Sequence, residues 1–96
     1  MGPVFEWDQA KAEANLTKHD VSFEEALTVF ADALARVFDD PDHSLDERHE
    51  IIIGHSILER LLLVCFTELA DDVIRIFSAR LATKMERKDY EENASR

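Results

Sequence analysis

The chain has one cysteine and two glycines among its 96 residues, and it contains no long apolar segment. Cys65 cannot form a disulfide within the chain, and its place in the apolar run LLLVCF predicts a buried thiol in a reducing compartment. With only Gly2 and Gly54, the chain has no glycine-rich phosphate loop and no G-x-S-x-G serine hydrolase motif. No apolar run approaches the roughly 20 residues that cross a bilayer, so we expect no membrane span. The first residues, MGPVFEWD, lack the features of a secretory signal, and we expect a cytoplasmic protein.

Basic residues are also scarce, with 11 Lys+Arg against 21 Asp+Glu and a net charge of −10. This balance argues against non-specific binding to nucleic acid, because that affinity comes largely from neutralising phosphates. The bases that are present are nevertheless concentrated in one segment, where Glu86 is the one acid: Arg75, Arg80, Lys84, Arg87 and Lys88. A local site for an anion is therefore compatible with the acidic total.

Helix signals dominate the first third of the chain. Asp8 is a suitable N-cap for a helix over residues 9–19, and Ser22 with Glu25 forms a capping box before a second helix. The end of the second helix is open: residues 31–38 either continue it or begin a strand. The polar, proline-containing residues 39–47 predict a loop.

Strand signals follow, over residues 49–53, 60–68 and 71–81, with gaps so short that antiparallel connections are expected. Thr83 and Glu86 form a second capping box, which opens a helix over residues 83–92 and leaves a frayed tail. The sequence thus predicts one α+β domain over residues 1–96, with two N-terminal helices, an antiparallel β-meander and a C-terminal helix. Phe5 and Trp7 are expected to pack on its core.

The basic segment is the main candidate for chemistry. Arg80 falls at the end of the third predicted strand, and Lys84, Arg87 and Lys88 fall at the start of the helix that follows. These side chains can converge on one concave surface that binds phosphate or stabilises a phosphoryl transition state. The alternative is a solvated helix face balanced by neighbouring acids, namely Glu86, Asp89, Glu91 and Glu92.

The four histidines do not have the spacing of a metal site. His49 and His55 lie on one side of an extended segment, roughly 20 Å apart at the rise of a strand, and the sequence has no H-x-x-x-H or C-x-x-C motif. We therefore expect no metal and no other cofactor. His19 follows Lys18 at a helix end, where it is either a general acid or base or a helix cap.

Several segments, in order along the chain, resemble the BrnT family, the toxins of a bacterial type II toxin–antitoxin system. They are FEWDQAKAEANLTKH (5–19), VSFEEALTVF (21–30), DPDHS (40–44), ERHEIIIGHS (47–56), LLLVCFTE (61–68) and IRIFSARLATKMERKDYEE (74–92). The most specific segment is S-A-R-x-A-T-x-x-E-R, from Ser78 to Arg87. The resemblance covers nearly the whole chain.

The resemblance implies a RelE-like fold and a ribonuclease that arrests translation without a metal. It also implies a hetero-oligomer with a BrnA-like ribbon-helix-helix antitoxin, through which alone the complex contacts DNA. A 2′-hydroxyl would attack the adjacent phosphorus with Glu25 or His19 as the base, while Arg80 at the S-x-R position would stabilise the developing charge. The implied catalytic residues are Arg80, Lys84, His19, Glu25 and Tyr90, and the implied RNA-binding residues are Arg75, Arg87, Lys88 and Lys18.

The chain departs from the family pattern at three positions. Asp20 stands where the family commonly has Gly, Leu69 stands where it often has Arg, and Ala33 stands where it commonly has Pro. The first two changes lower the positive potential, and Ala33 is expected to let the second helix run longer. The alternative function is therefore an attenuated or inactive protein that acts only as an interaction module for its antitoxin.

Overall fold

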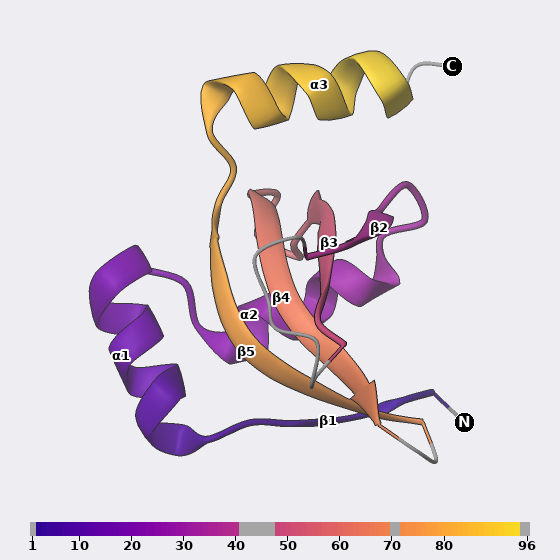
Figure 1. Cartoon of the computed structure of the whole chain (residues 1–96). Helices are drawn as coiled ribbons and strands as arrows, with labels where there is room; N and C mark the ends of the chain where they lie inside the picture. Colours follow the sequence, from indigo (N-terminus) through magenta and orange to yellow (C-terminus); the bar gives the residue numbers. More distant parts are fainter. Residues whose placement is uncertain (1, 41–47, 70–71, 95–96) are drawn as a thin grey trace.

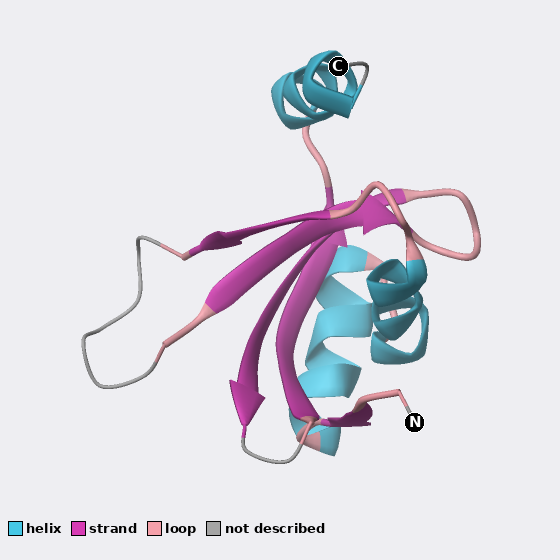
Figure 2. Ribbon diagram, turned by 90° about the vertical axis from the view of Figure 1, so that its right-hand side faces the viewer, coloured by secondary structure: helices cyan, strands magenta, loops and turns pink. Residues whose placement is uncertain are grey.

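The computed structural model describes residues 2–40, 48–69 and 72–94. These residues form one sheet with the strand order β1-β5-β4-β3-β2. Helices α1 (Gln9–His19) and α2 (Phe23–Thr28) cover one face of the sheet, and α3 (Lys84–Ala94) lies beyond one end of it (Figures 1 and 2). The strands are β1 (Val4–Glu6), β2 (Arg36–Asp39), β3 (Glu50–His55), β4 (Leu61–Leu69) and β5 (Val73–Leu81). The predicted α+β fold, with helices at both ends of the chain, is confirmed.

Each of the α-helices in the described residues begins at the predicted residue or one residue after it. Asp8 Oδ1 accepts a hydrogen bond from the Lys11 N–H at 3.1 Å, and Ser22 Oγ accepts one from the Glu25 N–H at 3.0 Å. In the last capping box, the Glu86 N–H donates to Thr83 Oγ1 at 3.1 Å. Each cap satisfies a backbone N–H that has no partner within its helix.

The second helix is shorter than the Ala33 comparison predicted. It ends at Thr28 and is followed by one 3₁₀ turn, Val29–Ala31. Asp32 then redirects the backbone, because its Oδ1 accepts the Leu34 N–H at 2.9 Å and its Oδ2 accepts the His55 N–H at 2.7 Å. These bonds hold the segment against β3, so the alternative of a strand is correct and β2 pairs antiparallel with β3.

The predicted hairpins are confirmed, since β4 pairs antiparallel with both β3 and β5. The sheet nevertheless contains a strand, β1, that the sequence did not predict. Val4–Glu6 pairs parallel with β5, with Phe5 opposite Ile74. A strand of three residues whose partner lies near the other end of the chain leaves no local pattern to read.

The core lies on both faces of β4. Leu62, Val64 and Phe66 pack under α1 and α2, where Phe5 and Trp7 join them as predicted. Leu61 and Leu63 face the other side, and α3 covers them through Tyr90. The two layers follow from the alternation of side chains along a strand that is buried on both faces.

Some predictions fall at the limits of the described residues. Most of the loop predicted over residues 39–47, and the first residue of the strand predicted over residues 71–81, lie outside them. Within them, Asn93 and Ala94 continue α3, so this part of the predicted frayed tail is helical. None of the described helices is long and apolar enough to cross a membrane.

Candidate functional site

Two of the predicted catalytic residues line one cleft. His19 at the end of α1 and Arg80 near the end of β5 border a hollow of about 200 Å³. Its lining is completed by Asp40, Ile51, Leu63, Cys65, Ser78 and Ala79. The structure thus brings together a group that can transfer a proton and a fixed positive charge.

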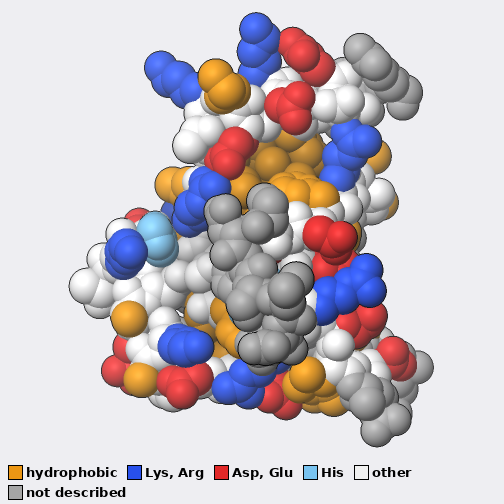
Figure 3. Space-filling view, viewed as in Figure 1, with side chains coloured by type: hydrophobic (Ala, Val, Ile, Leu, Met, Phe, Trp, Pro, Cys, Tyr) orange, Lys and Arg blue, Asp and Glu red, His pale blue; other side chains and the backbone are white. Residues whose placement is uncertain are grey.

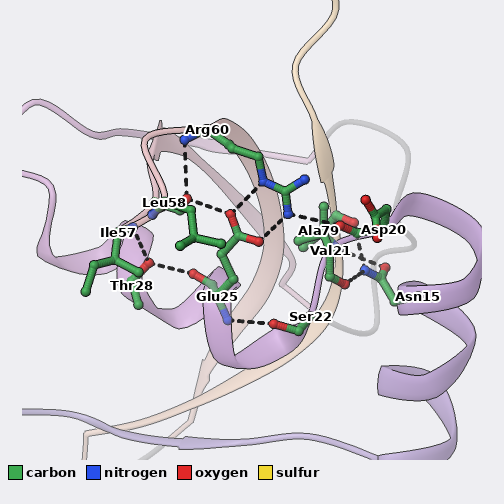
Figure 4. A network of polar contacts seen from close by, with 11 residues as sticks. Asn15, Asp20, Val21, Ser22, Glu25, Thr28, Ile57, Leu58, Arg60 and Ala79 are labelled. Carbon is green, nitrogen blue, oxygen red and sulfur yellow. Dashed lines mark hydrogen bonds and ion pairs between the residues drawn. The ribbon is translucent and has the colours of Figure 1, made fainter.

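A buried asparagine places these two residues side by side. Asn15 on α1 is 6% exposed, and its amide pairs with the backbone of Ala79 in both directions, at 2.9 Å and 3.0 Å. The same Nδ2 also donates to the Val21 carbonyl at 2.9 Å (Figure 4). Because Asn15 is one helical turn from His19 and Ala79 is next to Arg80, this contact fixes the end of α1 beside the end of β5.

Arg80 is held by a neighbouring carboxylate. Its Nη1 and Nη2 donate to the two oxygens of Glu86 at 2.8 Å and 2.9 Å, and Nη1 also donates to the Leu81 carbonyl at 3.2 Å. The hydrogen bonds from Arg80, with help from the Thr83 N–H, lower the pKa of Glu86 to about 2. The same pair raises the pKa of Arg80. One of the four acids that were predicted to neutralise the basic segment, Glu86, therefore does pair with a base of that segment.

This pairing leaves one edge of the Arg80 guanidinium for a ligand. A guanidinium carries five N–H groups, and the contacts with Glu86 and Leu81 use those at its far end. The Nε–H and the second Nη2–H point along the other edge, and no hydrogen bond from them is found within the described residues. Two parallel N–H groups on one edge match two oxygens of a phosphate.

A second hollow adjoins the cleft and carries two lysines. It has a volume of about 230 Å³, shares His19 and Ser78 with the first, and is bordered by Lys11 and Lys18. Lys11 Nζ lies 5.4 Å from the centre of the Phe77 ring. Lys18 was predicted from the sequence, but Lys11 was not. The available signal was their spacing of seven residues, which places them on one side of the helix with Ala14 and Asn15 between them.

The other predicted basic residues lie outside the cleft. Lys84, Arg87 and Lys88 are exposed on α3, and Figure 3 shows Lys and Arg side chains on that helix and on the flank below it. Arg75 is paired with Glu6, its register partner across β1 and β5. Of the predicted basic cluster, the cleft therefore receives Arg80 alone.

Glu25, predicted as a possible base, is buried in an ion-paired network. Its carboxylate accepts hydrogen bonds from Arg60 Nε at 2.9 Å, from Arg60 Nη2, and from Ser56 Oγ at 2.6 Å (Figure 4). The Arg60 hydrogen bonds hold the pKa of Glu25 below its usual value against the opposing effect of burial. Arg60 Nη2 also donates to the Asp20 carbonyl, so this network joins α2 to the residue that caps α1.

Tyr90 is also placed in the core. Its side chain is 4% exposed, and its hydroxyl is 3.3 Å from both Asp32 Oδ2 and the Leu34 carbonyl, to which it can donate. Burial, followed by the charge of Asp32, raises the pKa of the Tyr90 hydroxyl. It anchors α3 over a hollow in which Figure 3 shows apolar side chains.

One further cluster beside the cleft was not predicted. Asp40, His49 and Cys65 place one ligand-type atom each within 4.8 Å of one another. From the sequence, His49 was weighed as a metal ligand only together with His55, and Cys65 was interpreted as a small buried apolar residue. The three residues belong to different segments, and only the pairing of β2, β3 and β4 brings them together.

Comparison with known proteins agrees with this architecture. The fold is similar to the crystal structure of the Brucella abortus ribonuclease toxin BrnT, with a TM-score of 0.64 at 21% sequence identity, over 88% of this chain and 100% of that one. No curated protein sequence matches the chain. The family model described as the ribonuclease toxin BrnT of type II toxin–antitoxin systems matches residues 7–86. The chain therefore belongs to the BrnT family of ribonuclease toxins, and its partner is an antitoxin.

Proposed function

We propose that this chain is an endoribonuclease that cleaves RNA without a metal, arrests translation, and is neutralised by a BrnA-like ribbon-helix-helix antitoxin. The observation that carries the proposal is that His19 and Arg80, which are distant in sequence, line one cleft. A proton-transfer group beside a fixed cation is the minimum that RNA cleavage through the 2′-hydroxyl requires.

In this proposal an RNA phosphate binds the remaining edge of Arg80. His19 takes the proton of the 2′-hydroxyl, and the 2′-oxygen forms a bond to the adjacent phosphorus. The bond from phosphorus to the 5′-oxygen breaks, which leaves a 2′,3′-cyclic phosphate on one fragment. The 5′-oxygen takes up a proton from water and leaves as a hydroxyl on the other fragment, and His19 returns its proton to the solvent. Arg80 offsets the negative charge that grows on the phosphate oxygens.

His19 is favoured over Glu25 as the base. Both oxygens of Glu25 are engaged by Arg60 and Ser56, and its pKa is lowered, which makes it a weaker base. His19 borders the cleft and is only half-buried. Glu25 then acts by holding α2 and Arg60 in place.

The lysines extend the site for the RNA backbone. Lys11 and Lys18 border the hollow that continues the cleft. Lys84, Arg87 and Lys88 are exposed on the helix that follows β5. Such side chains position a phosphate backbone without reading its sequence. Tyr90 contributes by fixing the helix that carries three of them.

The test compares Arg80→Ala and His19→Gln with the wild-type chain in RNA cleavage with a chelator present, and in growth arrest. Removing one donor of this kind should lower the cleavage rate about 100- to 1,000-fold. Arg36→Ala is the matched control, because Arg36 is exposed on β2 and does not border the cleft. Its rate should equal that of the wild type.

Binding to the antitoxin separates loss of chemistry from loss of fold. Each variant should co-purify with the proposed ribbon-helix-helix antitoxin when the two proteins are co-expressed. If the wild-type chain binds that protein but neither cuts RNA nor arrests growth, the chain is an interaction module and the enzymatic proposal is wrong. Retention of full activity by Arg80→Ala would also overturn the proposed mechanism.

A further inference from the structure

The structure points to a second binding site, distinct from the proposed catalytic pair. We infer that Asp40, His49 and Cys65 bind a thiophilic divalent cation of the Zn²⁺ class. Each residue supplies a different ligand atom: a carboxylate oxygen, an imidazole nitrogen and a sulfur. This inference does not depend on the ribonuclease proposal, which needs no metal.

The two distances from the sulfur are close to those of a tetrahedral site, and the carboxylate oxygen and the imidazole nitrogen lie within 4.8 Å of each other. Cys65 Sγ lies 3.7 Å from Asp40 Oδ2 and 4.0 Å from His49 Nδ1. With zinc bonds of about 2.3 Å to sulfur and 2.0–2.1 Å to nitrogen and oxygen, a tetrahedral angle gives about 3.5 Å between the sulfur and either ligand. The sulfur therefore needs to move by only a few tenths of an ångström relative to each partner.

The backbone fixes the three residues in these positions. The Asp40 N–H donates to the His49 carbonyl at 3.0 Å, which extends the pairing of β2 and β3 by one step. Ile51 is the register partner of Cys65, so His49 lies two residues from the position opposite the sulfur. The His49 ring is stacked on Phe77, with ring centres 4.3 Å apart and planes at 20°. A site assembled this way binds with little loss of conformational freedom.

Burial and ligand chemistry select the class of cation. His49 is 8% exposed and Cys65 is 9% exposed, while Asp40 also borders the cleft. Sulfur and imidazole ligands favour Zn²⁺, Co²⁺ or Cd²⁺ over Mg²⁺ and Ca²⁺, which prefer oxygen. Asp40 and Cys65 also line the cleft, through which a cation could reach the site.

Without a cation, the surroundings of Cys65 oppose the thiolate that a cation requires, so binding has to offset this cost. Burial, with a smaller effect from the Asp40 charge, raises the pKa of Cys65 to about 12. A divalent cation reverses that balance, because it stabilises the thiolate and offsets the carboxylate charge. Binding should release one proton from Cys65 and strengthen as the pH rises through neutrality.

The test is a titration of reduced, untagged protein with Co²⁺, followed by displacement with Zn²⁺. We expect saturation at one cation per chain and a near-ultraviolet charge-transfer band from thiolate to cobalt. Because Cys65 is the single cysteine of the chain, this band assigns the sulfur ligand without a variant. Excess Mg²⁺ should not compete.

Variants then test the other two ligands. Asp40→Asn and His49→Gln should each weaken Co²⁺ binding at least about tenfold. His55→Gln, which alters a histidine outside the cluster, is the control and should bind as the wild type does. The inference is overturned if the wild type shows no charge-transfer band, if both ligand variants bind normally, or if light scattering shows that the band forms only between two chains.

Discussion

Glu86 is predicted to be as important for stability as for positioning Arg80. Replacing it with glutamine keeps the shape of the side chain but removes its charge. The amide oxygen of the glutamine can still accept the Thr83 N–H that caps α3, so the change isolates the ion pair with Arg80. We expect Glu86→Gln to be folded but less stable than the wild type at neutral pH.

The magnitude follows from the pKa of Glu86. A fall in pKa from 4.5 to about 2 corresponds to an upper limit of about 3.5 kcal/mol, at about 1.4 kcal/mol for each pH unit. The Glu86 side chain is 31% exposed and that of Arg80 is 41% exposed, so water screens much of this interaction. A loss of about 1–2 kcal/mol in the free energy of unfolding remains, equivalent to a decrease in Tm of roughly 4–16 °C for a domain of this size.

The pH dependence provides a sharper measurement. A carboxylate with a lowered pKa in the folded state stabilises the protein fully above its unfolded pKa, and that contribution is lost as the pH falls through the folded pKa. The difference in Tm between the wild type and Glu86→Gln should therefore be constant near neutral pH. It should shrink as the pH is lowered from about 4.5 towards 2.

The control is Glu92→Gln, which removes an exposed carboxylate from the same helix. Thermal unfolding of the three proteins is followed by circular dichroism at a series of pH values. It gives the difference in Tm between the wild type and each of the two variants. The reasoning fails if Glu86→Gln matches the wild type at neutral pH, or if the difference does not change down to the lowest pH at which both proteins fold.

Two further predictions concern the packing that positions the site. Asn15→Leu leaves the backbone partners of Asn15 at Val21 and Ala79 unpaired inside the protein, at a cost of about 1–3 kcal/mol for each group. Urea unfolding should therefore show that the free energy of unfolding falls by about 3 kcal/mol or more. A fall of less than about 1 kcal/mol would contradict the assigned hydrogen bonds. Gly54→Ala would place its Cβ 2.8 Å from Ala35 Cβ, and overpacking should destabilise the chain by about 1–3 kcal/mol. Gly2→Ala, which meets nothing within 4 Å, is the matched control, and equal midpoints for the two alanine variants would refute the clash.

The sequence predicted those parts of the fold that depend on local chemistry. Capping residues such as Asp8 and Ser22 mark helix starts through bonds to N–H groups only three residues away. The strands from Glu50 to Leu81 have dense β-branched and apolar residues with short connections. By contrast, β1 and the end of α2 depend on distant partners, namely β5 and the His55 N–H that binds Asp32.

The candidate site was predictable only in part for the same reason. Arg80 was selected from the clustering of basic residues, His19 from its position at a helix end, and both again by resemblance. Their common cleft, however, depends on Asn15, whose contact with Ala79 no spacing rule reveals. The cluster of Asp40, His49 and Cys65 depends on strand register, since a shift of one residue would turn Cys65 to the opposite face of the sheet.

Charge counting alone would not select Arg80 among the arginines. Arg60 has the same kind of partner, yet it uses its Nε and Nη2 for Glu25 and the Asp20 carbonyl, so its side edge is occupied. Arg80 uses its far end for Glu86, and its Nε–H makes no hydrogen bond among the residues that the structure describes. A carboxylate partner therefore neutralises one arginine but orients the other. The edge that each pair leaves available, more than the net charge of the molecule, determines where a phosphate can bind.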